Sequence, residues 1–248
     1  MGPRIPLARF GAGGLGMESV RKDLPPLVWL WFPPLAAATV LAADYFEWPA
    51  ICEVVLRRDR EGGGVLEWGT VLILVPATVA GAASVPRLRG MARARLLRIW
   101  VALWALACLY FAGEEMSWGQ WLFGWETPEV VRRFNDQGET NLHNVSNFLD
   151  QVPRAFVELF LFVGGLLLPL WRKVSGRGLD ERGIWYWILP THAGTVAAAV
   201  WTAAQLADWI EPEMACRLND SEVREFYIAA FLTLYLGSIW HRTRGPRP

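Results

Sequence analysis

Long apolar runs are the feature that most constrains this chain. Blocks of about 20 mostly apolar residues recur along its 248 residues, and 53% of the chain is hydrophobic. A helix rises about 1.5 Å per residue, so about 20 residues cross a hydrocarbon layer of roughly 30 Å. A soluble domain would instead divide its apolar residues into stripes and alternations. The sequence therefore predicts an all-α, polytopic integral membrane bundle.

Six transmembrane helices can be placed on these runs, and together they form one domain over residues 25–241. We expect a disordered cytoplasmic tail at 1–24 and a second cytoplasmic tail at 242–248. Met17 is an alternative start, which would leave residues 1–16 untranslated. Prolines inside the runs predict kinks. The predicted spans are Leu27–Phe46, Val65–Val85, Leu96–Gly113, Val152–Trp171, Ile184–Trp209 and Phe226–Trp240.

The charges are distributed unequally between the two sides of the predicted bundle. The N-terminal tail, the 86–98 and 172–183 loops and the C-terminal tail carry two-thirds of the Lys and Arg residues and few acids. By the positive-inside rule, this side is cytoplasmic. We therefore expect a multi-pass protein of the bacterial inner membrane with both termini inside. The lipid bilayer is its expected partner, a homo-oligomer is an alternative to a monomer, and nothing supports nucleic-acid binding.

One polar segment lies between the third and fourth runs, at residues 113–150 on the predicted outer face. Its first part reads GEEMSWGQWLFGWETPEVVRRFNDQGETNLHN. Thr127, Pro128 and Glu129 are a good helix start, and Gly138 a good stop. Because about ten residues cannot cross a bilayer, this helix should lie in the interface as a lid. The three Trp residues at 118, 121 and 125 are typical of an interfacial belt.

This segment contains the candidate metal site. In a helix, Glu139 and His143 lie on one face at i,i+4, and Glu114 and Glu115 stand at the end of the third run. Four such side chains would be metal ligands, with Glu114 and Glu115 also able to act as general acid or base. Carboxylates with one imidazole suit a divalent ion such as Fe, Mn or Zn. If the third helix continued, Glu114 would meet Trp118, and Glu115 would meet Gly119.

A structural role explains the same residues without a metal. Gln120, Asn141, Asn144 and the acids could hydrogen bond the backbone of a half-buried loop, because backbone at that depth must find partners. Under this reading, the segment is a hydrogen-bonded plug or a docking surface.

Four further polar residues lie at or inside the spans. Glu67 follows the start of the second run, where it either reaches back to water or points into the bundle. Glu158, His192 and Asp208 could serve a proton-linked carrier, although no internal repeat relates the first three spans to the last three.

The motif residues resemble an uncharacterised family of bacterial multi-span membrane proteins. The shared pattern is GEE-x-SWGQ at 113–120, TPE at 127–129, Asn135, Gln137 and Glu139, then NLHN at 141–144, with Glu67-Trp68 upstream. This resemblance covers about 40 residues and implies no activity. A weaker similarity connects the chain to the ceramidase-like superfamily of seven-span metal-dependent hydrolases. The chain departs from that superfamily in its span number and in lacking its Ser-x-x-x-His and His-x-x-x-His patterns.

From these features we expect a membrane protein with a metal site at its outer face, and the hypothesis extends to a metal-dependent enzyme acting on a lipid or envelope substrate. A non-catalytic structural or partner-binding protein and a proton-linked carrier are the alternatives.

Overall fold

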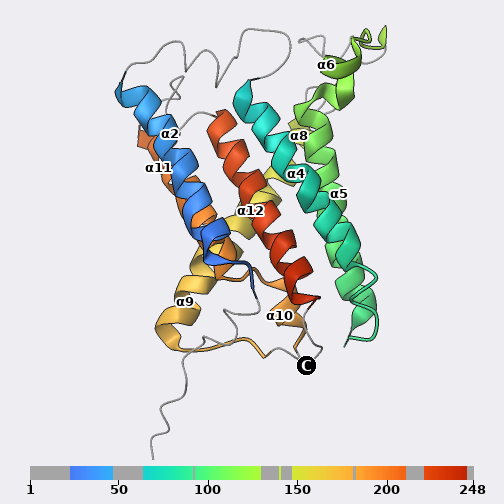
Figure 1. Cartoon of the computed structure of the whole chain (residues 1–248), viewed down its shortest axis with the longest axis vertical. Helices are drawn as coiled ribbons and strands as arrows, with labels where there is room; N and C mark the ends of the chain where they lie inside the picture. Colours follow the sequence, from blue (N-terminus) through green and yellow to red (C-terminus); the bar gives the residue numbers. More distant parts are fainter. Residues whose placement is uncertain are drawn as a thin grey trace, which may run out of the picture.

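The chain folds as a bundle of helices. The computed structural model describes residues 23–46, 64–91, 93–129, 140, 147–180, 183–210 and 221–244. Within these ranges no residue lies in a strand, and the long helices stand side by side (Figure 1). The all-α fold class predicted from the apolar runs is confirmed.

The helices follow the predicted runs in order. The first half of the chain forms η1 (Leu27–Trp31), α2 (Phe32–Tyr45), α4 (Val65–Ser84), α5 (Ala94–Glu115), η2 (Ser117–Gly119) and α6 (Gln120–Phe123). The second half forms α8 (Asn147–Leu159), η4 (Phe160–Leu167), α9 (Leu168–Ser175), α10 (Ile184–Ile188), η5 (His192–Gly194), α11 (Thr195–Ile210) and α12 (Ser221–Arg242). The predicted interfacial helix after Thr127 falls mostly outside the described residues.

Three helices are long and apolar enough to cross a membrane: Val65–Ser84, Ala94–Glu115 and Gln151–Ser175. A shorter apolar helix covers Leu27–Ala42. Large apolar side chains on the outside of these helices are exposed, among them Leu72, Leu103 and Leu159. Such surfaces are unfavourable in water and ordinary in lipid. The apolar helices therefore support the transmembrane assignment.

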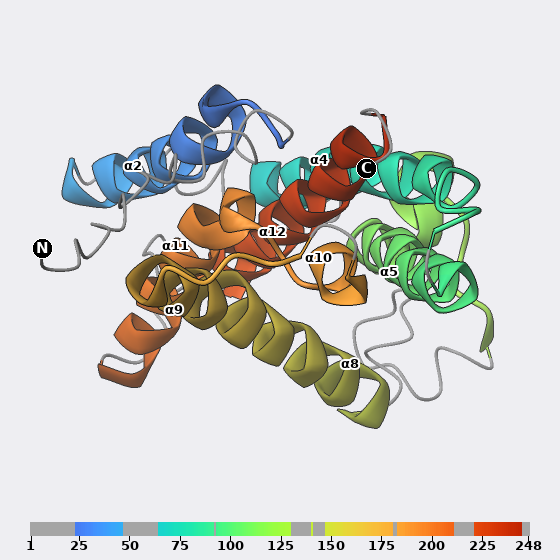
Figure 2. The same ribbon diagram turned by 90° about the horizontal axis from the view of Figure 1, so that it is seen from below.

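Helix α12 runs through the middle of the bundle, packed against α4 and α11 (Figures 1 and 2). Apolar side chains on every side of it are buried. It begins at Ser221 rather than at the predicted Phe226. The helix includes Glu222, Arg224 and Glu225, because polar residues of a membrane helix are tolerated where they face the protein interior.

Helix α4 lies close to α5, and a glycine makes this approach possible. A Cβ on Gly81 would lie 2.8 Å from the Cβ of Ala105, closer than real Cβ atoms come. The close contact of α4 with both α5 and α12 holds the C-terminal end of α5 near the start of α12.

The predicted span Ile184–Trp209 was expected to be one helix kinked at Pro190, but the structure divides it into separate helices. The chain breaks after α10 at Leu189, which is extended, and Pro190 follows before the helix resumes through η5 into α11. Proline has no N–H and clashes with the preceding turn, and here it ends the helix instead of only bending it. Consequently His192 does not lie on a regular helix face but begins a single 3₁₀ turn.

The carbonyl groups freed by this break find side-chain donors. Tyr235 donates its hydroxyl to the carbonyl oxygen of Ile188 at 2.7 Å. Arg242 donates to Tyr186 O at 2.5 Å, and Arg172 donates to Pro190 O at 3.3 Å. Irregular backbone inside a membrane protein requires such partners, and these three donors supply them.

Candidate functional site

Helix α5 ends at Glu115, where the chain turns sharply. Ser117 and Trp118 both have positive φ angles, 45° and 54°, so the helix does not continue as predicted. The predicted contact forms nevertheless: Trp118 Nε1 donates to Glu114 Oε1 at 2.5 Å. The indole folds back over Gly113, where a Cβ would lie 3.0 Å from its ring. Glycine at 113 therefore makes room for this reversal.

Gln120 connects the two halves of the polar segment. Its amide nitrogen donates to Thr127 Oγ1 at 3.1 Å, and its carbonyl oxygen accepts from the backbone N–H of Thr140 at 2.8 Å. The hydroxyl groups of Thr127 and Thr140 lie 3.2 Å apart. These bonds show that Gln120 acts as a structural tie between parts of the chain 20 residues apart.

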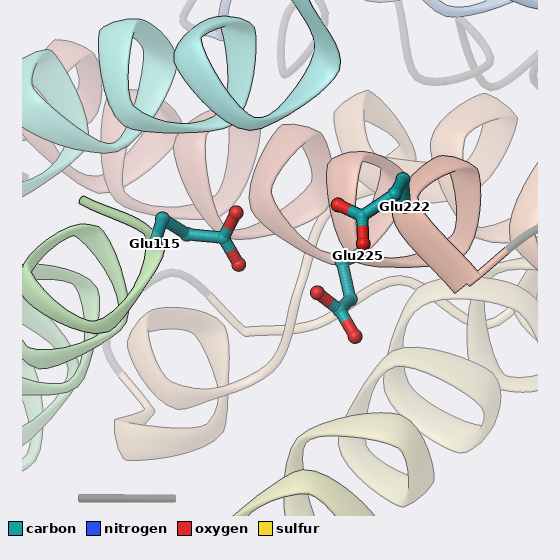
Figure 3. Close-up of side chains that lie close together, drawn as sticks. All are labelled: Glu115, Glu222 and Glu225. Carbon is teal, nitrogen blue, oxygen red and sulfur yellow. The ribbon is translucent and has the colours of Figure 1, made fainter. Parts of the chain in front are cut away.

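Glu115, which follows Glu114 at the end of α5, forms a cluster with two glutamates at the start of α12. Oxygen atoms of Glu115, Glu222 and Glu225 all lie within 4.8 Å of one another (Figure 3). We call these three residues the acidic cluster. Glu222 and Glu225 are three residues apart on α12 and therefore share one face of it. Glu115 and Glu225 face each other, and a hydrogen bond between their side chains would require a proton on one of the two carboxyl groups.

One cation stands beside the acidic cluster. Arg154 of α8 contacts Glu225 at 2.9 Å and Glu158 at 3.1 Å. Its single charge is thus divided between a member of the cluster and a second glutamate. Glu67 adds further electrostatic repulsion on Glu115. Carboxylates brought this close together are stabilised by a bound cation or by protons.

A cavity of about 170 Å³ adjoins the cluster between α5, α8 and α12. Most of its wall is apolar or aromatic, formed by Ala107, Tyr110, Phe111, Pro153, Val157, Ile228 and Leu232. Its polar wall is formed by Glu114, Glu115, Arg154 and Glu225. Glu115 and Glu225 belong to both the cluster and the cavity.

The predicted ligands are only partly within the described residues. Glu114 is buried and bonded to Trp118, whereas Glu115 joins the acidic cluster. Both glutamates line the cavity. Four predicted site residues lie outside the described residues: Glu139, Asn141, His143 and Asn144. The metal-ligand roles of Glu139 and His143 remain predictions.

Glu67 lies near the site but has a capping role. Its carboxylate accepts from the backbone N–H of Gly64 at 2.8 Å, which caps the start of its own helix.

The three residues predicted for a proton-linked carrier have separate partners. Glu158 pairs with Arg154, Asp208 pairs with Arg224 at 2.8 Å, and the His192 ring meets Trp29 edge to face at 5.0 Å. Among the described residues, no hydrogen bond, ion pair or ring contact joins any two of the three.

Sequence reasoning missed two residues of the site: Glu222 and Glu225. Their signal was an E-x-x-E spacing just before the last apolar run. These residues would have been assigned to a helix if that run had been extended by one and a half turns. Arg154 was predicted from the sequence to pair with the acids, and it pairs with Glu158 and Glu225.

The donor set of the acidic cluster can be compared with metal-site geometry. Carboxylate oxygens suit Mg²⁺, Ca²⁺ and Mn²⁺, and they occur in iron sites built from helices. Two oxygens on opposite sides of Ca²⁺ stand about 4.6–5.2 Å apart, from bond lengths of about 2.3–2.6 Å. Smaller ions require about 4.0–4.4 Å and hence a slight contraction of the cluster. The three glutamates therefore fit a divalent cation.

Comparisons with protein-family profiles, curated protein sequences and solved structures found no match to this chain.

Proposed function

We propose that this protein is a six-span membrane protein that binds a divalent cation through Glu115, Glu222 and Glu225. One observation carries the proposal: the two carboxylates Glu115 and Glu225 belong both to the acidic cluster and to the wall of an apolar cavity. A cation held there would adjoin a space for an apolar ligand. Such a pairing is typical of ligand sites, which are mostly apolar with a few converging polar groups.

Charge balance supports a cation at this position. Carboxylates close together in a poorly hydrated place are unfavourable unless protons or cations compensate them. Arg154 offers only part of that compensation, because it also pairs with Glu158. A divalent ion would satisfy all three glutamates at once.

The same site offers the elements of a metal-dependent enzyme acting on a lipid or envelope substrate. A bound divalent cation supplies Lewis-acid polarisation of a carbonyl or phosphoryl oxygen. The chain itself places the carboxyl groups of Glu115 and Glu225 beside each other and a positive charge at Arg154. These groups could position and protonate a substrate atom placed beside the cavity.

The topology belongs to the same proposal. The Arg-rich loops and both termini would lie in the cytoplasm of a bacterial cell and the acidic cluster at the outer face of the inner membrane. Labelling of single cysteines by a membrane-impermeant reagent in intact cells tests this orientation. A cysteine at Glu126 should react, whereas one at Arg177 should not.

A hydrogen-bonded plug is the second candidate function, and a specific observation favours it. The Trp118–Glu114 bond and the bonds from Gln120 to Thr127 and Thr140 connect the described parts of the polar segment to one another. Under this alternative the acidic cluster holds protons rather than a metal.

Metal binding separates the two candidates. Purified protein is stripped with chelator and titrated with Mn²⁺, Fe²⁺, Zn²⁺ and Ca²⁺ by calorimetry, with bound metal confirmed by elemental analysis. We expect near-stoichiometric binding to wild type and its loss in Glu222→Gln and Glu225→Gln. Glu126→Gln removes an exposed carboxylate from the same end and is the matched control. Folded wild type that binds none of the four ions would overturn the proposal and favour the plug.

A further inference from the structure

The walls of the cavity beside the acidic cluster define the chemistry of a ligand that would fit it. Tyr110, Val157, Ile228 and Leu232 line it with apolar surface, and the charged side chains are confined to the residues around Glu115 and Arg154. A ligand that complements such walls has an apolar chain and a polar head.

The cavity adjoins surfaces that face lipid. Helix α8 lies at the edge of the bundle, and it packs less closely on α5 than α4 does (Figure 2). Both helices also carry exposed apolar side chains, including Leu106 on α5 and Phe156 on α8. A cavity between two such helices is suited to a ligand that is dissolved in the bilayer.

The size of the cavity argues for occupation. Apolar cavities of about 150 Å³ are large enough to bind a small apolar molecule such as benzene. At about 170 Å³, this cavity holds one segment of an alkyl chain rather than a whole two-chain lipid.

We propose that the cavity binds the alkyl chain of a membrane lipid whose phosphate head group lies beside Arg154 and the cation at the acidic cluster. The placement of the head group rests on the proposed function, because it uses the cation site. The placement of the alkyl chain rests on the cavity alone. Arg154 is the only cation among the described residues that line the cavity, and guanidinium and divalent cations are the usual partners of phosphate. Without the metal, the surrounding glutamates repel an anionic head, so phosphate binding requires the cation.

Dodecyl phosphate is the probe, measured by equilibrium dialysis against full-length protein in a steroid-based detergent that has no alkyl chain. Ala107→Phe fills the cavity from α5, and Val157→Phe fills it from α8 as a second variant. Leu106→Phe is the control, because Leu106 is exposed on the same helix. Inorganic phosphate reports the head group alone.

With Mn²⁺ present, we expect dodecyl phosphate to bind wild type and Leu106→Phe alike. Either cavity-filling variant should weaken binding by about tenfold or more while metal content stays unchanged. Inorganic phosphate should bind weakly and equally to all four proteins. Equal binding of dodecyl phosphate to a folded cavity-filling variant, or no gain over inorganic phosphate, would overturn the inference. If wild type binds no metal, the proposed function is overturned. If dodecyl phosphate binding still depends on the cavity in that case, only the alkyl-chain site is supported. Loss of both metal binding and dodecyl phosphate binding would overturn both proposals.

Discussion

The two ends of the bundle each contain charged side chains inside the protein, but they differ in what surrounds them. At one end, Arg172 and Arg242 donate to backbone carbonyls around α10; we call this the arginine end. The Nη2 atom of each of these two arginines is buried without a hydrogen-bond partner among the described residues. At the other end, the acidic cluster brings three half-buried carboxylates together with one Arg shared outside it. The arginine end therefore meets backbone carbonyl groups, whereas the acidic end places like charges beside one another.

This difference teaches how a polar residue in a membrane helix can be interpreted. At the arginine end, the broken helix leaves backbone carbonyl groups without helical partners, and the arginines donate to them, so no ligand is required to explain these charges. At the acidic end, Glu222 lies in the first turn of α12, where free backbone N–H groups favour a carboxylate, but the described residues show no backbone partner for Glu115 and Glu225. Charged side chains inside the bundle therefore have a structural reason in one place and support a ligand-binding interpretation in the other.

The largest expected effect is at the arginine end. Arg242 is buried, bonds Tyr186 O and lies over the Tyr186 and Trp187 rings at 4.8 and 5.3 Å. Arg242→Met leaves a buried carbonyl without that donor, and we expect it to lower the free energy of unfolding by about 2–4 kcal/mol. Chemical denaturation in detergent measures this. Arg244→Met is the control. Arg244 is exposed, and its side chain lies over the Trp240 ring, while its backbone N–H donates to His241 O. Equal stability of wild type and Arg242→Met would refute the structural role of this end.

Tyr235 provides the next largest effect. Its hydroxyl donates to Ile188 O and accepts from Trp100 Nε1, both at 2.7 Å. Tyr235→Phe removes both bonds in a buried position, with an expected loss of about 2 kcal/mol in the free energy of unfolding. Thr39→Val removes an exposed hydroxyl bonded to its own helix and should change stability by under about 0.5 kcal/mol. A Tyr235→Phe loss no greater than that of the Thr39 variant would show that the broken helix does not depend on side-chain donors.

Gly113→Ala tests the local structure that separates Glu114 from Glu115. The added methyl group would meet the Trp118 ring at 3.0 Å and weaken the bond from Trp118 to Glu114. We expect a loss of about 1 kcal/mol in the free energy of unfolding, because Trp118 is partly exposed. Gly178→Ala has open space around it and should be neutral. If the two alanine variants are equally stable, Gly113 is not needed for the reversal.

The long helices could be predicted from the sequence because apolar runs of membrane length require little else. Helix α5 begins and ends within two residues of the predicted span. The break after α10 could not be predicted. A proline in a membrane helix kinks it or ends it according to the partners available, and here those partners are Arg172, Tyr235 and Arg242, up to 56 residues away along the chain.

The candidate site was only half predictable for a similar reason. Glu115 follows an apolar run and stands out from it, so the sequence indicates it directly. Glu222 and Glu225 precede the last run and read as loop, because the burial of their helix depends on α4 and α11 rather than on its own hydropathy. Whether Glu139 and His143 join this end stays a prediction, and loss of bound metal in Glu139→Ala and His143→Ala would support it.

Glu115→Gln has the smallest expected effect on stability, and the sign of this effect distinguishes the acidic end from the arginine end. Glu115 is the last residue of α5, where the helix dipole disfavours a negative charge, and it also meets two further acids. Glu115→Gln keeps the size and a hydrogen-bond donor for Glu225 but removes one carboxyl group. In metal-free protein at pH 8 we expect it to raise the free energy of unfolding by about 0.5–1 kcal/mol, opposite in sign to Arg242→Met. Added Mn²⁺ should stabilise wild type and Glu126→Gln but not Glu115→Gln, because only a protein that binds the ion gains from it. A destabilised Glu115→Gln that is insensitive to Mn²⁺ would instead show that the acidic cluster, like the arginine end, is a structural network.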